Sequence, residues 1–582
     1  MKLPLLFLMI FSASGLYAQL FIGPSVKSDS YIYAKDRLVY VEKEIELSEN
    51  RKVEPAASIY LRKDSQMLQG EKENNNNKGN GKISIFQEGT SNAYDYNYWS
   101  LPVLAALSGS LVNDYIFDPV NSTYSKNAKL ISALDGQSNP LSISNRWIYT
   151  FSGSNYSNWA FLGDHFDLLP GEGFTMKGVN GTNLNEIEGV PINNGNAQTY
   201  DFRGLPNDGI IGLPIKKDQV LLVGNPYPSA LDLNKFLIEN TSTTGIAYFW
   251  DSKENGNSHL LTDYEGGYGT YSPGVGVYIP PMFKRYSNGS ETGETGKYYE
   301  RKISPIGQGF MVIGQKDGTL GFRNSYRVFQ KEDPAISVFK SHEIENISLN
   351  LDIEIDSVYM QKLALVLKDD SSPDEDHALD ARKMNENPID ISWSISNKAF
   401  VINVRPKLNE ELIPLRILLD KDSDLKFSIS DLSNFNPDRI FIYDAKDDLY
   451  FSIKTGYLKI NLLQGEYNDR FFLSFIEKLP MDSEVENEKP SLEVKPLNIL
   501  LNSIEIFQNN AENQLEVRVL YEAGIKNLSL HDLNGKLFHF ENFKNLEKEF
   551  NFPTGNLSNA VYIVKVNTTD NRELTKKISI RN

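Results

Sequence analysis

The C-terminal segment, residues 498–582, alternates apolar and polar side chains on both sides of a two-residue turn, Asn534-Gly535. Asn-Gly supplies the positive φ angles of a tight β-hairpin turn, and a period of two places alternate residues on one face of a strand. Residues 19–93 also read as short strands broken by polar turns, and the strands over 336–475 alternate more regularly. The sequence therefore predicts an all-β protein built of several β-sandwich-like domains in tandem.

The 582 residues contain no cysteine, which excludes disulfides and thiol chemistry. Stability must then come from sheet cores large enough to bury their own apolar surface. The chain has 59 Lys and Arg against 76 Asp and Glu, a net charge of −17. Such a surface repels nucleic acid and anionic membranes, so we expect neither as a partner. After the first eighteen residues, no apolar run reaches the roughly eighteen residues of a transmembrane helix, so no transmembrane segment is expected.

The N-terminus has the parts of a secretory signal peptide. Lys2 precedes an apolar stretch that ends near Phe11, and the small residue Ala18 is followed by Gln19. The apolar stretch is too short to span a bilayer. The sequence predicts cleavage between Ala18 and Gln19 and a protein that leaves the cytoplasm.

Composition divides the rest of the chain. Residues 478–497 are acidic, contain proline and have few large apolar residues, which predicts an extended linker. Within the aromatic stretch, Asp232 is placed to cap a short helix in which Leu233, Phe236 and Leu237 share one side. The predicted divisions are a signal peptide (1–18), an N-terminal β region (19–93), an aromatic-rich β domain with one short helix (94–334), a β-sandwich domain (335–477), an acidic linker (478–497) and a small C-terminal domain (498–582).

The aromatic stretch contains a short internal repeat. The pattern G-x-G-F-x-x-x-G begins at Gly171 and again at Gly307. Each copy predicts a tight turn that leads into a strand with an inward-facing aromatic ring, Phe174 in the first copy and Phe310 in the second.

Aromatic residues supply the candidate ligand platform. Alternation places Tyr94, Tyr96 and Tyr98 on one face of a strand and Trp99 on the other, and Trp250 lies in a second aromatic strand. Aromatic faces stack on sugar rings, so Tyr96, Tyr98, Trp99 and Trp250 are our candidates for a carbohydrate platform. For any one of these residues, the commoner role of an aromatic at strand spacing is in the core.

An acidic cluster raises the question of a metal. One predicted loop contains five acidic residues whose carboxylates could bind calcium: Asp369, Asp370, Asp374, Glu375 and Asp376. The loop lacks the glycine and the ligand register of a recognised calcium loop, so solvated charge is the favoured interpretation. We predict no metal site and no other cofactor.

Local signatures of catalysis are missing. The six histidines contain no i, i+4 pair, and neither a G-x-S-x-G elbow nor a phosphate-cradling Gly-Lys-Ser/Thr occurs. The carboxylate pair of a glycosidase stays open, because its spacing is spatial rather than sequential. We name no catalytic residue and expect a binding protein rather than an enzyme.

The C-terminal domain resembles the sorting domain of type IX secretion substrates. It contains that family's D-x-x-G-K hairpin, a strand of its L-x-x-G-x-Y-x-x-K-V type in which Ala560 replaces the usual glycine, and its basic closing strand. The matching positions are Asp532, Gly535 and Lys536 in the first motif, Tyr562 in the second with Gly555 in the segment just before that strand, and Lys576 and Lys577 in the third. The resemblance implies a small immunoglobulin-like fold, transport by the type IX secretion machinery, and a secreted or outer-surface location in a Gram-negative bacterium.

The middle of the chain resembles exported surface proteins of the same secretion route. The shared strings are Y-W-S-L-P-V at 98–103, G-N-P-Y-P-S-A-L-D at 224–232, Y-F-W-D at 248–251 and G-Q-G-F at 307–310. This resemblance does not assign an activity. From the aromatic platform above, we expect an adhesive or binding protein whose partner is an extracellular glycan or a surface protein. The alternatives are a secreted polysaccharide-acting enzyme, with a deep cleft and two facing carboxylates, and a structural surface-layer component, with a large self-association face.

Overall fold

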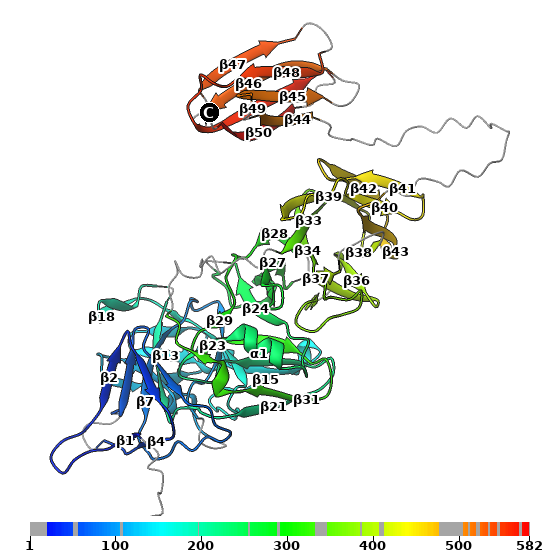
Figure 1. Cartoon of the computed structure of the whole chain (residues 1–582). Helices are drawn as coiled ribbons and strands as arrows, with labels where there is room; N and C mark the ends of the chain where they lie inside the picture. Colours follow the sequence, from blue (N-terminus) through cyan, green and yellow to red (C-terminus); the bar gives the residue numbers. More distant parts are fainter. Residues whose placement is uncertain are drawn as a thin grey trace, which may run out of the picture.

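The structure is a computed structural model. It describes residues 20–580 apart from 51–55, 105–108, 196, 254–255, 288–290, 332–345, 385–386, 407–411, 477–503, 510–511, 520–523, 533–535, 544–546 and 570–572. The described chain is almost entirely β, as predicted (Figure 1). Among these residues, no helix has the length and apolar character needed to cross a membrane. The predicted cleavage site at Ala18-Gln19, the linker over 478–497 and the turn residue Gly535 lie outside the described residues.

The N-terminal strands belong to a sheet that also contains later parts of the chain. Its strands, in spatial order, are β10 (Ser125–Asn127), β9 (Ile116–Pro119), β20 (Thr199–Gly204), β7 (Ile83–Glu88), β5 (Ile59–Arg62) and β2 (Ile32–Lys35). Phe202 on β20 pairs in register with Ile85 on β7. The sheet thus joins strands on both sides of the predicted division at residue 93. The sequence did not predict this joining, because a pairing over such a sequence distance leaves no local signal.

The central sheet of the aromatic-rich region curls on itself. Its main path, in spatial order, is β28 (Glu291–Thr295), β27 (Met282–Arg285), β25 (Glu265–Ser272), β24 (Ala247–Ser252), β30 (Gly309–Ile313), β22 (Val220–Gly224), β14 (Tyr149–Gly153), β16 (Gly173–Lys177) and β8 (Tyr96–Ser100). The terminal strand β8 also contacts β24 and β30, and Trp99 forms a bridge with Gln308. A Cβ at Gly309 would lie 2.7 Å from the Tyr98 carbonyl carbon, so this close approach requires glycine. The curl therefore brings the Tyr96–Ser100 strand next to the strands that carry Trp250 and Tyr268.

Both copies of the internal repeat adopt the predicted structure. Gly171 and Gly307 have positive φ angles of +90° and +71°, and strands β16 and β30 begin two residues later. Phe174 and Phe310 are both fully buried. The turn, the strand and the inward aromatic ring are confirmed in each copy.

The predicted helix is present as α1 (Leu233–Glu239). Asp232 caps it, since its Oδ1 accepts a hydrogen bond from the Lys235 backbone N–H at 2.9 Å. Leu233, Phe236 and Leu237 are its buried residues, so the predicted apolar side is confirmed.

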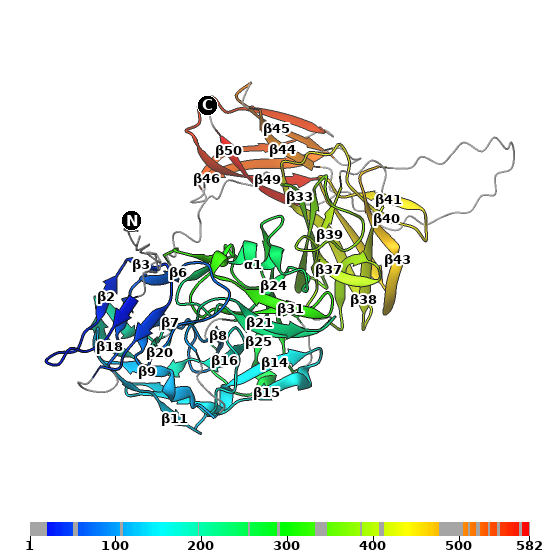
Figure 2. The ribbon, with the colours of Figure 1, turned by 60° about the horizontal axis from the view of Figure 1, so that its bottom comes forward.

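Residues 347–474 form a second, longer-stranded sheet (yellow and light green in Figure 2). Its main path is β41 (Leu449–Ser452), β40 (Phe441–Asp444), β43 (Gly465–Ser474), β38 (Ile413–Leu419), β36 (Asp390–Ile395), β37 (Lys398–Arg405), β34 (Tyr359–Leu367), β33 (Ile347–Ile355), β39 (Ser423–Ser433) and β42 (Tyr457–Leu462). Along β33 and β38 buried and half-buried side chains alternate, which is the pattern of a strand with one face on a core. β34 and β37 also pack against the aromatic-rich region, where Val366 and Ile402 share a buried cluster with Tyr248 and Met311.

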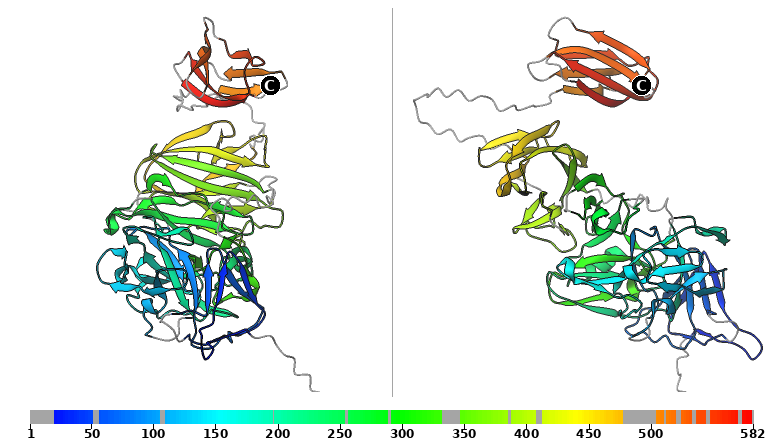
Figure 3. Two further views of the ribbon diagram at one scale, coloured as in Figure 1. Left: turned by 90° about the vertical axis from the view of Figure 1, so that its left-hand side faces the viewer. Right: turned by 180° about the vertical axis from the view of Figure 1, so that it is seen from behind.

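The C-terminal domain is a two-sheet sandwich, seen in orange and red in Figure 3. One sheet contains β44 (Ile504–Asn509), β45 (Gln514–Val519) and β48 (Glu549–Pro553); the other contains β47 (Leu537–Asn542), β46 (Ile525–Asp532), β49 (Ala560–Thr568) and β50 (Glu573–Ile580). Val517 from the first sheet and Leu528 and Val564 from the second share one buried cluster. The two sheets therefore enclose a common core.

Candidate functional site

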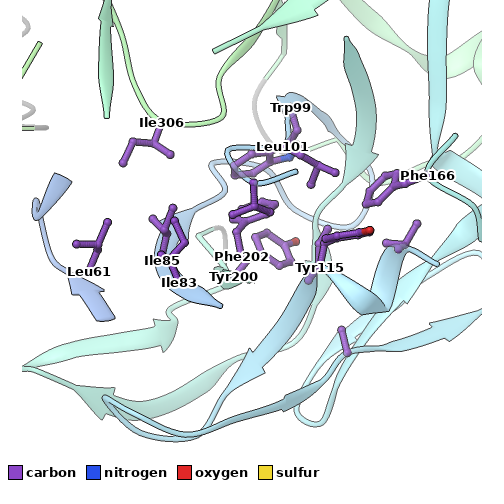
Figure 4. Close-up of a cluster of buried hydrophobic side chains, with 14 of the residues drawn as sticks. Leu61, Ile83, Ile85, Trp99, Leu101, Tyr115, Phe166, Tyr200, Phe202 and Ile306 are labelled. Atoms are coloured by element: carbon purple, nitrogen blue, oxygen red, sulfur yellow. The ribbon is translucent and has the colours of Figure 1, made fainter. Parts of the chain in front are cut away.

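Trp99 lies in the core rather than on an exposed platform (Figure 4). Its side chain is 4% exposed, and its ring centroid is 5.8 Å from that of Tyr200 and 5.5 Å from that of Phe202. Strand β8 turns this face toward β20 and the N-terminal sheet, so the predicted ligand role of Trp99 is corrected to a packing role.

Tyr98 faces the opposite side of β8, where the curled sheet partly buries it. Its hydroxyl is 2.8 Å from the hydroxyl of Tyr268, and its ring stacks on Trp250 at 6.3 Å between centroids. Burial raises the pKa of Tyr98 well above its ordinary value. Tyr98 therefore packs against Trp250 and Tyr268 inside the curled sheet, and it does not form an exposed row with Tyr96.

Tyr96 and Trp250, the other two predicted residues, line one pocket of about 200 Å³. We call it the aromatic pocket. Residues of β8, β24 and β25 supply its walls, together with Tyr94 and Asp95 before β8 and residues between 256 and 264. Its remaining lining residues are Tyr94, Asp95, Ser252, Lys253, Gly256, Asn257, Ser258, Asp263, Tyr264 and Glu265. Rings, carboxylates and small polar groups thus surround a single hollow.

A buried lysine lies behind the rings of this pocket. The Lys177 ammonium lies 4.9 Å from the ring centroid of Tyr96, 4.6 Å from that of Tyr264 and 4.0 Å from that of Trp147. Burial lowers the pKa of Lys177 to about 7, although the nearby carboxylates of Asp95 and Asp135 oppose that shift. Three aromatic rings thus face the ammonium, an arrangement in which cation–π attraction stabilises the charge.

Lys177 is also the first member of a polar chain. Its Nζ is 3.0 Å from His259 Nδ1, and His259 Nε2 contacts the Asp135 carboxylate. The His259 ring stacks on Trp147 at 5.1 Å. These contacts position Trp147 and Lys177 and so fix the wall behind Tyr96 and Tyr264. The alternation of the sequence did not single out Lys177. The available signal was a charged residue at the end of the otherwise uncharged, buried strand β16, where Lys177 pairs in register with Tyr96.

Asp95 is the pocket carboxylate with the most altered acidity. Burial raises its pKa to about 6, while Lys177 and a hydrogen bond with Ser252 oppose the shift. A Cβ on Gly256 would come within 2.7 Å of Asp95 Oδ1, so glycine makes room for this carboxylate. Asp95 can hold or release a proton near neutral pH at the pocket wall.

The acidic loop over 369–376 holds Arg382, which in turn contacts the aromatic-rich region. Both Glu375 carboxylate oxygens accept hydrogen bonds from Arg382, at 2.6 and 2.8 Å, and Arg382 also reaches Asp218 at 2.8 Å. Asp376 accepts a hydrogen bond from the Ser372 hydroxyl at 2.9 Å. Within the described part of the chain, no group of three or more His, Asp and Glu side chains is arranged to hold a metal ion.

Two of the sorting-motif residues, Asp532 and Tyr562, have clear structural roles in the C-terminal sandwich. Asp532 Oδ1 accepts the Lys536 backbone N–H at 2.9 Å, which closes the β46–β47 hairpin. Tyr562 is 1% exposed and lies in the core, and its hydroxyl donates to the Ser558 carbonyl. Gly555 follows β48, and Lys576 and Lys577 on β50 are both exposed.

Comparison with known families decides the classification. A family profile described as "Domain of unknown function (DUF8693)" matches residues 34–475, which span both large sheets. The chain belongs to that family. A second profile, "Secretion system C-terminal sorting domain", matches residues 505–581. This family member is thus a type IX secretion substrate that is exported to the outer cell surface of a Gram-negative bacterium.

Two further comparisons add little. No curated protein matches the chain. A solved structure described as "Biofilm associated protein - BSP domain" aligns over 86% of this chain and 96% of its own, with 9% identity and a TM-score of 0.14. That score is too low to establish a shared fold.

Proposed function

We propose that this exported protein is an adhesive element that binds extracellular carbohydrate in the aromatic pocket. The observation that carries the proposal is the meeting of Tyr96, Trp250 and Tyr264 with three carboxylates in one hollow. Aromatic faces cover the apolar C–H faces of sugars, and carboxylates accept hydrogen bonds from sugar hydroxyls. Asp263 is exposed and Glu265 half-buried, so ligand hydroxyls can reach both.

The fixed backing of the pocket supports recognition rather than loose contact. Lys177 lies among the rings of Tyr96, Tyr264 and Trp147. Lys253 forms an ion pair with Glu265, with 2.9 Å between the ammonium nitrogen and a carboxylate oxygen. A wall that is ordered before binding loses less conformational entropy when the ligand arrives.

The test is retention of the full chain on a panel of soluble and insoluble polysaccharides. Trp250→Ala and Tyr264→Ala are expected to weaken binding of the retained glycan by about tenfold or more. Tyr31→Ala is the matched control, since Tyr31 is 56% exposed and does not line the pocket. Failure of every glycan to bind, or equal losses in all three variants, would refute the proposal.

A second candidate function is hydrolysis of the bound glycan, and the acidity of Asp95 favours it. A carboxyl with a pKa of about 6 suits a general acid, and Asp263 and Glu265 line the same pocket. The measurement is release of reducing ends from each retained polysaccharide, with Asp95→Asn as the variant. Release of reducing ends by the wild type but not by Asp95→Asn would establish catalysis. If the wild type releases none, hydrolysis is refuted and only the binding function remains.

The third hypothesis, that the protein is a structural surface-layer component, predicts self-association. Sedimentation of the full chain over a range of concentrations measures it directly. A monomer at all concentrations would contradict that reading.

A further inference from the structure

A second pocket, of about 260 Å³, lies where the two large sheets meet. β25, β27 and the residues beside them form one side of it, and β34, β37 and the segment after β35 (Ala381–Arg382) form the other. We call it the seam pocket. The residues that matter for its chemistry are Tyr268, Lys284, Arg285, Tyr286, Lys362 and Lys383.

The seam pocket is cationic in an acidic protein. Four of its lining residues are Lys or Arg and none is Asp or Glu, although the whole chain has a net charge of −17. The acids that pair with these cations stand outside the lining. Lys383 Nζ is 2.8 Å from the buried carboxylate of Asp390, and Lys362 Nζ is 3.5 Å from Asp352. These carboxylates position the cations and partly neutralise them. The lining itself presents cationic side chains and no carboxylate, which favours an anion over a cation.

The seam pocket adjoins the aromatic pocket. Trp250 lines the aromatic pocket, and its ring centroid lies 5.3 Å from Tyr268 and 5.8 Å from Tyr286, both of which line the seam pocket. Glu265 of the aromatic pocket pairs with Arg285 of the seam pocket at 3.2 Å. One aromatic cluster thus forms the wall between an acidic hollow and a basic one.

We propose that the seam pocket binds the anionic group, carboxylate or sulfate, of an acidic polysaccharide whose neighbouring sugar ring occupies the aromatic pocket. This inference rests on the proposed function and narrows its ligand to charged glycans. Pockets for drug-sized ligands have about 300–1,000 Å³, so each of these two hollows takes one ring or one acidic group. An extended chain that crosses the Trp250 wall would fill both.

Lys284 and Lys362 are the residues to change. Both are half-buried, and their loss leaves Arg285 paired with Glu265 and Lys383 paired with buried Asp390. The test variant is therefore Lys284→Gln with Lys362→Gln. Its matched control is Lys446→Gln with Lys459→Gln, which removes two exposed lysines that do not line the pocket. Circular dichroism and the Tm of each variant verify the fold.

Affinity of the full chain is measured for polygalacturonate, for the same polymer with its carboxyl groups reduced, for dextran sulfate and for dextran. We expect at least one charged polymer to bind about tenfold or more tightly than its uncharged counterpart, with a preference that weakens at high salt. The test variant should lose most of that preference and keep its affinity for the uncharged polymer. Which charged polymer is preferred distinguishes carboxylate from sulfate.

Two results would overturn the inference. If the test variant keeps the preference, or loses it only as much as the control does, the seam pocket is not the anion site. Loss of binding in Trp250→Ala would then still uphold the proposed function. If the wild type binds none of the four polymers or the wider panel, both proposals fail.

Discussion

The two faces of strand β8 differ in what they pack against, although the same residue types occupy both. Trp99 points into a core shared with Tyr200 and Phe202. On the other face, Tyr98 packs against Trp250 and Tyr268, and Tyr96 packs against Trp147 and Tyr264. The first face is enclosed by a neighbouring sheet. The second is enclosed by the curl of its own sheet, which leaves a pocket beside Tyr96. An aromatic strand can thus face a closed core on one side and a pocket on the other, and what encloses each face decides which of the two it becomes.

The largest effect separates the two tryptophans. Trp99→Ala should cost about 3–5 kcal/mol of unfolding free energy, because it empties a fully enclosed site. Trp250 is half-buried beside a pocket, so Trp250→Ala should cost clearly less. Denaturant unfolding of both variants measures the difference. Equal costs would mean that Trp250 is a core residue and that the two faces do not differ.

Lys177 makes the pocket face sensitive to pH. Its pKa falls from 10.5 in the unfolded chain to about 7 in the folded one because burial disfavours the ammonium. Between pH 7 and 10.5 the unfolded chain binds more protons at this site, so the unfolding free energy rises with pH across that window. Lys177→Met should flatten this rise. Stability curves over the same range check it, and an unchanged slope in the variant would contradict the burial of the ammonium.

Asp95 acts in the opposite direction and over a narrower window. Its pKa rises from 3.8 to about 6 on folding, mainly through burial, so the folded chain binds more protons between these values. The unfolding free energy should therefore fall as pH increases from 3.8 to 6. Asp95→Asn is expected to remove this part of the fall. Identical pH profiles for the variant and the wild type would argue that solvent reaches Asp95 freely.

The smallest effect concerns Tyr98. Tyr98→Phe should cost about 1 kcal/mol, because it removes the hydrogen bond to the Tyr268 hydroxyl and keeps the ring. Tyr31→Phe on the exposed surface serves as the control and should be near neutral. A neutral Tyr98→Phe would show that the hydroxyl pair contributes nothing to the closure of the sheet.

Local sequence rules predicted the local features well. The cap at Asp232 and the buried side of α1 follow from the position of one acid and three apolar residues. The glycine turns at Gly171 and Gly307 follow from a short repeated string. These features depend on neighbours a few residues apart, where backbone geometry and side-chain alternation act directly.

The candidate site was predicted only in part. Tyr96 and Trp250 do share a pocket, but Trp99 does not, and alternation could not tell which face of β8 would be enclosed. Lys177 is the last residue of strand β16, whereas His259 and Asp135 lie in segments between strands. These three residues are far apart in the chain, and the tertiary fold brings them together. The seam pocket depends on two separate sheets meeting, for which no single segment carries a signal.

By itself the sequence determined the all-β class, the short helix, the glycine turns and the C-terminal sorting domain. Each of these depends on strand period, turn chemistry or a contiguous motif. Only the tertiary structure decided that Trp99 is core, that Lys177 lies behind aromatic rings, and that a basic pocket adjoins an acidic one. The physical reason is that the two faces of a strand are equivalent until the sheet curls and a neighbouring sheet covers one of them.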